Sequence, residues 1–196
     1  MKRESERGGS SLTSKQIERE LRRRELAAET RGAIYRAIRT LIVFAAAAVL
    51  IVTFLFPTIQ VQRSSMSPTL RDDEQLILTT LGKINRGDII AFHHGSQTLV
   101  KRVIATAGES VNVNAEGLVY INGILLDEPY LQDRSLGECD LKFPFQVPDK
   151  QFFVLGDNRA VSKDSRLSEI GTIHKDEIIG KTILRIWPLT RISLVK

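Results

Sequence analysis

Three short polar segments interrupt the apolar runs that follow residue 57, and they hold most of the side chains that could do chemistry. The first, residues 64–70, reads SSMSPTL and offers several hydroxyl groups. The second is the pair Lys101-Arg102, and the third, residues 156–166, reads GDNRAVSKDSR. A serine hydroxyl becomes a nucleophile when a neighbouring base takes its proton, so hydroxyls and an amine together could perform acyl transfer.

Each segment taken singly also has a structural explanation. Ser, Pro and Thr are common turn residues. Alternation along a strand places Lys101 and Arg102 on opposite, otherwise apolar faces, so at least one cation should be partly buried unless the strand lies at a sheet edge. The Asp and Arg residues of the third segment fit either a buried salt-bridge network or an ordinary charged turn. The residues alone leave these alternatives open.

Other catalytic groups are scarce in this sequence. The single cysteine, Cys139, excludes an intrachain disulfide, and its GECD context has no basic residue to lower the pKa of the thiol. His93 and His94 are adjacent on a predicted strand and point to opposite faces, while His174 lies elsewhere in the sequence. We therefore expect no metal ion and no organic cofactor.

Alternating apolar residues predict that the chain after residue 57 is mainly β, with antiparallel strands. Residues 174–179 could form a helical turn. The dipeptide Asn122-Gly123 is a strong signal for a two-residue hairpin. The predicted strands are residues 74–81, 87–94, 98–107, 110–114, 118–121, 124–126, 151–155 and 181–187.

A charge-free run of 17 residues, Thr40–Phe56, predicts a membrane-spanning helix. As a helix it would be about 25 Å long, slightly less than the roughly 30 Å hydrocarbon core, so the span is extended to residues 34–57. A cleaved signal peptide is the first alternative, but no small-x-small pair follows the run. A buried core helix is the second, but the run lacks a polar face.

Charge is concentrated before this run. The sequence has 196 residues and a net charge of +5, and residues 1–39 carry all of it, with 11 basic and 6 acidic side chains. The excess of Lys and Arg predicts a cytoplasmic N-terminus and an extracytoplasmic body. The electrically neutral body argues against binding to nucleic acid. We expect a basic, partly helical tail (1–33), a signal-anchor helix (34–57) and a β-rich extracytoplasmic domain (58–196).

In this order and behind an N-terminal span, the segments SSMSPTL, RGDIIAF, LVKRVIATAGE and LGDNRAVSKDSR resemble the type I signal peptidases, also called bacterial leader peptidases. The resemblance covers about residues 40–188. It implies a serine endopeptidase with a Ser-Lys dyad, anchored in the plasma membrane, that removes signal peptides from exported preproteins. It further implies contact with the lipid bilayer and transient contact with the secretion machinery. The cap domain would be reduced, within about residues 110–147.

The resemblance also implies roles for individual residues. Ser65 would be the nucleophile and Lys101 the general base. Ser64 would contribute to the oxyanion site, and the hydroxyl of Ser162 would orient the lysine. The residues implied to support the site are Met66, Gly87, Asp88, Arg102, Gly156, Asp157, Arg159, Asp164 and Arg166.

Physical chemistry sets requirements for this dyad. A lysine can act as a base only when neutral, whereas its ordinary pKa is about 10.4. Burial beside Leu99 and Val103 should lower that pKa. The backbone N–H of Ser65 could hold the oxyanion. Some relatives carry a second oxyanion serine where this chain has Arg63, so the second donor stays open.

Two further expectations follow from the same residues. The substrate should bind as an extended strand beside an exposed sheet edge. Apolar side chains around Met66 should rest on the outer leaflet. Two other functions remain open: a catalytically silent, membrane-tethered domain that binds exported chains, and a Ser-Lys hydrolase that matures one dedicated substrate.

Overall fold

The structure is a computed structural model and describes residues 14–195. The chain divides into two compact units, residues 1–51 and residues 52–196. The described part of the first unit belongs to one long helix, and the second unit contains all of the described strands. The strand-rich unit carries the three polar segments.

Helix α1 runs without interruption from Ser14 to Leu55, 42 residues in all. The helix is continuous across residue 33, where the predicted tail (1–33) ends and the predicted span (34–57) begins. Only Gly32 opposes continuity, and one glycine inside a helix costs about 1 kcal/mol. The helix ends two residues before Pro57, whose ring cannot continue it. Its apolar part is long enough to cross a membrane, and side chains such as Phe44 are exposed.

The β-strands form two sheets in which every pair is antiparallel, as the sequence predicts. The strands are β1 (Thr58–Gln60), β2 (Gln75–Thr79), β3 (Ile89–His94), β4 (Gln97–Thr106), β5 (Ser110–Val113), β6 (Val119–Ile121), β7 (Ile124–Leu125), β8 (Phe145–Gln146), β9 (Gln151–Leu155), β10 (Ile173–His174), β11 (Ile178–Trp187) and β12 (Ser193–Leu194).

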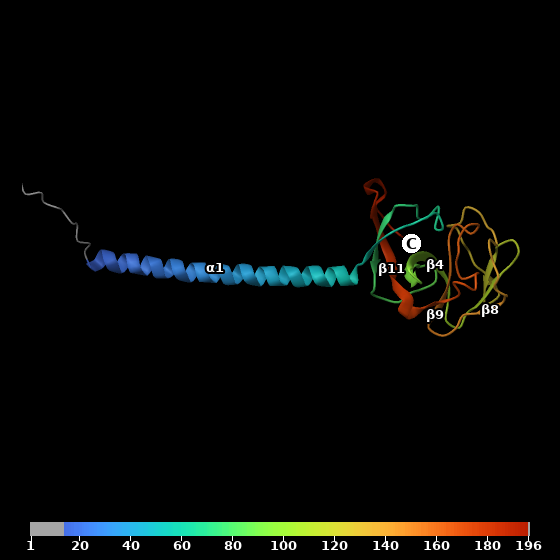
Figure 1. Cartoon of the computed structure of the whole chain (residues 1–196), viewed down its shortest axis with the longest axis horizontal. Coiled ribbons are helices and arrows are strands. Elements are labelled where there is room, and N and C mark those ends of the chain that lie inside the picture. The colour runs from blue at the N-terminus through green and yellow to red at the C-terminus, as the bar shows by residue number, and fades with distance from the viewer. Residues whose placement is uncertain (1–13, 196) are drawn as a thin grey trace, which may run out of the picture. The chain divides into compact units, whose positions relative to one another are not determined.

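The larger sheet has the order β1-β2-β11-β3-β4-β9-β10, and β12 pairs with β11. Strand β4 is therefore an interior strand, between β3 and β9 (Figure 1). Its two neighbours do not cover it equally. Strand β3 pairs with residues 97–102, whereas β9 pairs only from Arg102 onward. The first half of β4 consequently has one unpaired backbone edge.

The smaller sheet has the order β7-β6-β5-β8 and lies beside β9, on the side away from β11 (Figure 1). Asn122-Gly123 forms the predicted hairpin between β6 and β7, with positive φ at both residues (51° and 81°). The buried face of the smaller sheet includes Val111 and Val119. These side chains belong to one apolar cluster with Phe153 of β9. The two sheets therefore share a core.

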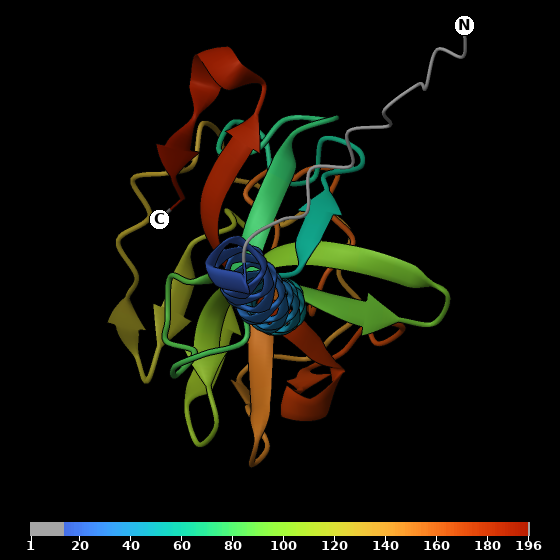
Figure 2. The same cartoon turned by 90° about the vertical axis from the view of Figure 1, so that its left-hand side faces the viewer.

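Sequence alternation predicts the longer strands well and misses the short ones. Strands β1, β8, β10 and β12 have two or three residues each, too few to show a period. The turn expected near residue 174 is a 3₁₀ helix, η1 (Lys175–Glu177). A second, η2 (Leu189–Arg191), links β11 to β12 in the red C-terminal hairpin of Figure 2.

Candidate active site

The loop between β1 and β2 carries the predicted nucleophile. It is folded onto itself by backbone hydrogen bonds from Ser67 N–H to the Ser64 carbonyl (3.0 Å) and from Leu70 N–H to the Met66 carbonyl (2.8 Å). Met66 and Leu70 are fully buried in the core. The Met66 side chain therefore anchors the loop from inside and does not reach the surface, while the contact of the apolar side chains around it with the outer leaflet stays a prediction. Ser65 is left half-buried beside a cavity.

Lys101 reaches the same cavity from the interior strand β4. Its side chain is buried, and its Nζ donates a hydrogen bond to Ser65 Oγ at 2.7 Å. Arg102 is buried as well, at 2% exposure, on the opposite face of the strand. The alternative of an edge strand with two solvated cations is wrong. The two residues that the resemblance paired as base and nucleophile are in direct contact.

Burial of Lys101 lowers the pKa of its ammonium group from 10.5 to about 8. The negative charge of Asp164 opposes this shift, Arg166 adds to it, and Asp157 opposes it weakly. At pH 7 about a tenth of the molecules would carry the neutral amine. Desolvation therefore lowers the pKa of Lys101 enough for a minority of the molecules to carry the neutral amine, which can act as a base, at pH 7.

Ser162 lies next to the dyad but does not orient it in this structure. Its hydroxyl is buried and has no hydrogen-bond partner among the described residues. The residue is held through its backbone, where its N–H donates to the Asn158 carbonyl at 3.0 Å. The orienting role stays a prediction that requires the hydroxyl to find the lysine during the reaction.

Gly156 is required by close approach. A Cβ atom added there would lie 2.1 Å from Ser162 Oγ and 2.5 Å from the Ser65 carbonyl oxygen. The same carbonyl accepts a hydrogen bond from the Asn158 N–H at 3.0 Å. The turn after β9 therefore fixes the position of the Ser65 backbone. Any side chain at residue 156 would displace that backbone.

The four charges predicted in the third segment form a buried network, not an exposed turn. Asp164 accepts two hydrogen bonds from the Arg166 guanidinium, at 2.7 and 2.8 Å, one from the Arg166 N–H at 3.3 Å and one from the Gly156 N–H at 3.0 Å. Asp157 and Arg159 are also buried but pair with residues outside the segment. The segment is thus tied to other parts of the chain.

Asp157 pairs with Arg102 through two hydrogen bonds, from Nε at 2.9 Å and from Nη2 at 2.7 Å. It also accepts a hydrogen bond from the Thr69 hydroxyl, at 2.5 Å, in the nucleophile loop. Arg159 donates to Glu128, a buried carboxylate that sequence reasoning missed. Its partner is 31 residues away, and no local motif indicates such a pair.

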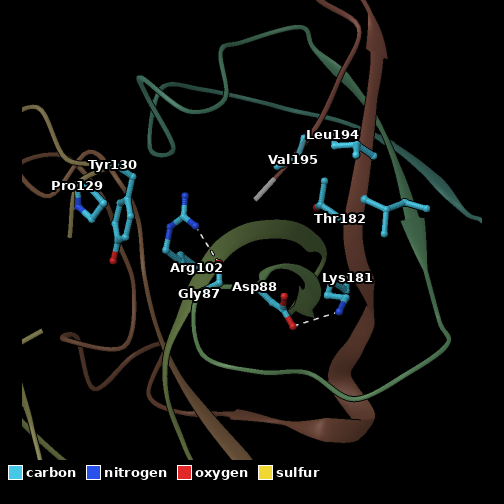
Figure 3. Close-up of a pocket in the computed structure, with 10 residues that line it drawn as sticks. Gly87, Asp88, Arg102, Pro129, Tyr130, Lys181, Thr182, Leu194 and Val195 are labelled. Atoms are coloured by element: carbon cyan, nitrogen blue, oxygen red, sulfur yellow. Dashed lines mark hydrogen bonds and ion pairs between the residues drawn. The ribbon is translucent and has the colours of Figure 1, made fainter. Parts of the chain in front are cut away.

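Gly87 and Asp88 lie on the Arg102 side of β4, away from Ser65. The Gly87 carbonyl accepts a hydrogen bond from Arg102 Nη1 at 2.8 Å, and Asp88 forms an ion pair with Lys181 at 3.3 Å (Figure 3). Both residues line a cavity of about 810 Å³ that also contacts Arg102 and Tyr130. Of the two, Gly87 contacts Arg102 directly, whereas Asp88 pairs with Lys181 of β11, and their supporting role stays a prediction.

The cavity at the dyad measures about 430 Å³. Ser65 and Lys101 line it, together with Ser64, Arg63 and His94. The Ser65 N–H donates no hydrogen bond among the described residues and is free to meet an oxyanion. His94 lies in this cavity although sequence reasoning set the histidines aside.

Arg63 adopts a left-handed backbone conformation (φ 71°), which non-glycine residues rarely take. Its N–H donates to Asp72 Oδ1 at 2.7 Å and so closes the base of the nucleophile loop. The described residues do not identify a second oxyanion donor among Arg63 and Ser64, and that assignment stays open.

Comparisons of the sequence with known proteins find several relatives. The family model described as "Signal peptidase, peptidase S26" matches residues 34–187. The chain is 32% identical over 169 residues to "Probable signal peptidase I-2" of Synechocystis sp., covering 80% of this chain and 75% of the relative. It is 32% identical over 179 residues to "Signal peptidase I" of Streptococcus pneumoniae serotype 4, covering 71% and 86%. It is 34% identical over 158 residues to "Signal peptidase IB" of Staphylococcus aureus strain Mu50, covering 70% and 81%.

The chain therefore belongs to the signal peptidase family, peptidase S26. Its activity is that of a signal peptidase I, an enzyme that cleaves signal peptides from preproteins. The expected family and enzyme class are confirmed.

Proposed function

We propose that the chain is a membrane-anchored serine endopeptidase in which Ser65 is the nucleophile and Lys101 the general base. The observation that carries this proposal is the 2.7 Å hydrogen bond between the buried Lys101 amine and the Ser65 hydroxyl oxygen. The lowered pKa of Lys101, about 8, supports it, because only the neutral amine can accept a proton.

The reaction follows from these groups. Neutral Lys101 takes the Ser65 proton while the serine oxygen attacks the carbonyl carbon of the scissile peptide bond. The oxyanion that forms is held by the Ser65 N–H. The protonated lysine then gives its proton to the leaving amine, which breaks the peptide bond and leaves an acyl-enzyme. Lys101 next activates a water molecule, whose attack releases Ser65.

The substrate would bind as an added strand. Residues 97–101 of β4 have an unpaired backbone edge, and they line the same cavity as Ser65. Strand β1, at the edge of the sheet, reaches this cavity at Gln60. An extended peptide between these edges could bond to backbone on both sides. Its scissile carbonyl would then lie against Ser65 and Lys101, which line the same cavity.

The test is cleavage of a purified preprotein by the full chain in detergent. We expect Ser65→Ala and Lys101→Ala each to lower the rate by at least a thousandfold, since removal of one member disables the unit. Ser96→Ala, in the exposed β3–β4 turn, and Lys142→Ala, at an exposed site, are matched controls that should cleave normally. Retained cleavage in either dyad variant would exclude the mechanism.

The same assay separates the alternatives. A tethered binding domain would retain the preprotein without cleaving it, in the wild type as in the variants. A dedicated maturation protease would cleave one substrate and spare others, so two or three unrelated preproteins should be compared. We expect several of them to be processed.

A further inference from the structure

Two side chains of the loop between β7 and β8, Glu128 and Tyr130, contact residues of the larger sheet and of the loop that follows β9. Glu128 is buried, at 3% exposure, and Tyr130 is half-buried. Neither residue lines the cavity that holds Ser65. Figure 3 shows the Tyr130 ring beside the guanidinium of Arg102. This contact connects the loop with the strand that carries Lys101.

The Tyr130 side chain is fixed at both ends. Its ring centre lies 4.0 Å from Arg102 Cζ, which is a cation–π contact. Its hydroxyl donates a hydrogen bond to Glu128 Oε1 at 2.8 Å. Burial, followed by the negative charge of Glu128, raises the pKa of the phenol, so it remains a neutral donor at any pH where the enzyme works. Glu128 in turn is held by Arg159.

From Arg102 the contacts continue to the nucleophile loop. Arg102 donates hydrogen bonds to both carboxylate oxygens of Asp157, and Asp157 accepts a further hydrogen bond from the Thr69 hydroxyl. Thr69 is four residues after Ser65. A ring, a guanidinium, a carboxylate and a hydroxyl therefore form one unbroken series of contacts from the loop to the residues around the nucleophile.

A second series starts at Glu128. Its partner Arg159 donates through Nε to the Gly156 carbonyl at 3.0 Å. Gly156 is the residue that lies against the Ser65 carbonyl and Ser162. One series therefore ends at Thr69 in the nucleophile loop and the other at Gly156, and both depend on residues 128–130 of the loop.

We infer that Tyr130, oriented by Glu128, is a positioning residue that fixes Arg102 and Asp157 behind the Ser-Lys dyad. The inference rests on the proposed function. It assigns to the β7–β8 loop a part in the reaction that neither the motifs nor the family match indicates.

The physical consequence concerns the charge balance around Lys101. Asp157 and Asp164 raise the pKa of Lys101, and Arg166 lowers it. Arg102 neutralises Asp157 at close range while its guanidinium is held in place. Loss of the Tyr130 ring frees Arg102 to shift, so more of the Asp157 charge reaches Lys101. The pKa of Lys101 should then rise, and less neutral amine is available at a given pH.

The experiment compares Tyr130→Leu with Tyr130→Phe in the full chain. For Tyr130→Leu we expect kcat to fall about tenfold with little change in KM, because the dyad is displaced and not the substrate-binding edges. The acid limb of the pH–rate profile should move up by about half a pH unit. Tyr130→Phe keeps the ring on Arg102 and should retain the wild-type midpoint.

Tyr120→Leu is the matched control, since Tyr120 is a half-buried tyrosine of β6 that has no hydrogen bond or ring contact with this series among the described residues. A purely structural loss lowers the amount of active enzyme without moving the midpoint, so Tyr120→Leu should show no shift. If Tyr130→Leu does not fold, Tyr130→Met replaces it, because methionine fills irregular space and lacks the aromatic face.

An NMR titration of the Lys101 side-chain carbons, assigned by their loss in Lys101→Ala, gives the same pKa without a cleavage assay. A raised midpoint in Tyr130→Leu supports the inference. A folded Tyr130→Leu protein with the wild-type midpoint overturns it. If the wild type fails to cleave, the proposed function is lost, while the titration still decides whether Tyr130 controls Lys101.

Discussion

At pH 7 the ammonium form of Lys101 outnumbers the amine, because burial brings its pKa to about 8 and not below neutrality. The protein's other charges explain the limit. Two buried carboxylates, Asp157 and Asp164, oppose the desolvation of Lys101, and only Arg166 acts with it. The buried salt bridges that hold the loops around the dyad thus restrain the base that they surround.

This limit gives a pH dependence with a definite sign. The active form has lost a proton, so kcat/KM should rise about tenfold per pH unit below pH 8 and level off above it. Initial rates of preprotein cleavage between pH 5.5 and 10 (about two units either side of the pKa) would define the curve.

His94, which lines the same cavity, supplies the rival explanation for any such curve. A solvated lysine would place the midpoint at about 10.4. His94→Asn should leave the midpoint unchanged. If the pH dependence of the rate disappeared in His94→Asn, His94 and not Lys101 would be the general base.

The sequence predicts the role of a single residue where that residue lies in a recognisable motif. Ser65 and Lys101 lie in segments whose order along the chain resembles a known family. Glu128 and Tyr130 have no such signal, because their partners are in remote segments and a DEPY sequence reads as an exposed turn. The polar neighbours of Met66 in the sequence give no sign that the loop folds its side chain into the core.

At the scale of elements, β11 connects the nucleophile loop with the C-terminal hairpin through one side chain. Arg185 of β11 donates to the Thr69 carbonyl (3.1 Å), to Glu74 (2.9 Å) and to the Ser193 hydroxyl of β12 (2.7 Å). Glu74 is 2% exposed and is also paired with Arg191 of η2. Three elements therefore depend on one guanidinium.

Arg185→Met should lower the free energy of unfolding by about 2 kcal/mol, because a buried carboxylate loses one partner while Arg191 remains. Cleavage should also slow, since the Thr69 carbonyl loses its donor. Urea unfolding of the detergent-solubilised chain measures the first effect. Arg134→Met, at an exposed site of the β7–β8 loop, is the control, and equal stability of the two variants would contradict the prediction.

Strand order explains which features of the elements the sequence could not give. Alternation identifies β4 and the apolar faces of its neighbours, but it does not say that β4 is interior. Strands β3 and β9 both flank Arg102, whereas only β3 flanks Lys101, and yet both side chains are buried on the two faces of the strand. Two-residue strands such as β8 and β10 exist only because a partner strand is present.

At the scale of the whole molecule, the uninterrupted helix α1 exceeds what one membrane crossing requires. Its 42 residues amount to about 63 Å, roughly twice the hydrocarbon thickness. The charge-free run occupies only its C-terminal part, and the preceding turns contain charged residues from Lys15 to Arg39. We propose that the apolar part spans the bilayer and that the charged part continues the helix into the cytoplasm.

The charge distribution predicts the direction of insertion. Residues 1–39 carry 11 basic and 6 acidic side chains, while residues 40–196 are balanced at 17 of each. Positively charged flanks remain on the cytoplasmic side, so Ser14 should lie inside and the peptidase domain outside. A membrane-impermeant maleimide can report both positions through single cysteines in a Cys139→Ser background.

In intact cells we expect the reagent to label a Ser96→Cys variant, whose residue is exposed in the β3–β4 turn, and to leave Ser14→Cys unlabelled until lysis. Both variants should label equally after lysis, which controls for reactivity. Labelling of Ser14→Cys alone in intact cells would reverse the orientation. It would also place Ser65 on the side where preproteins still carry their unexported signal peptides, and the proposed reaction could not follow export.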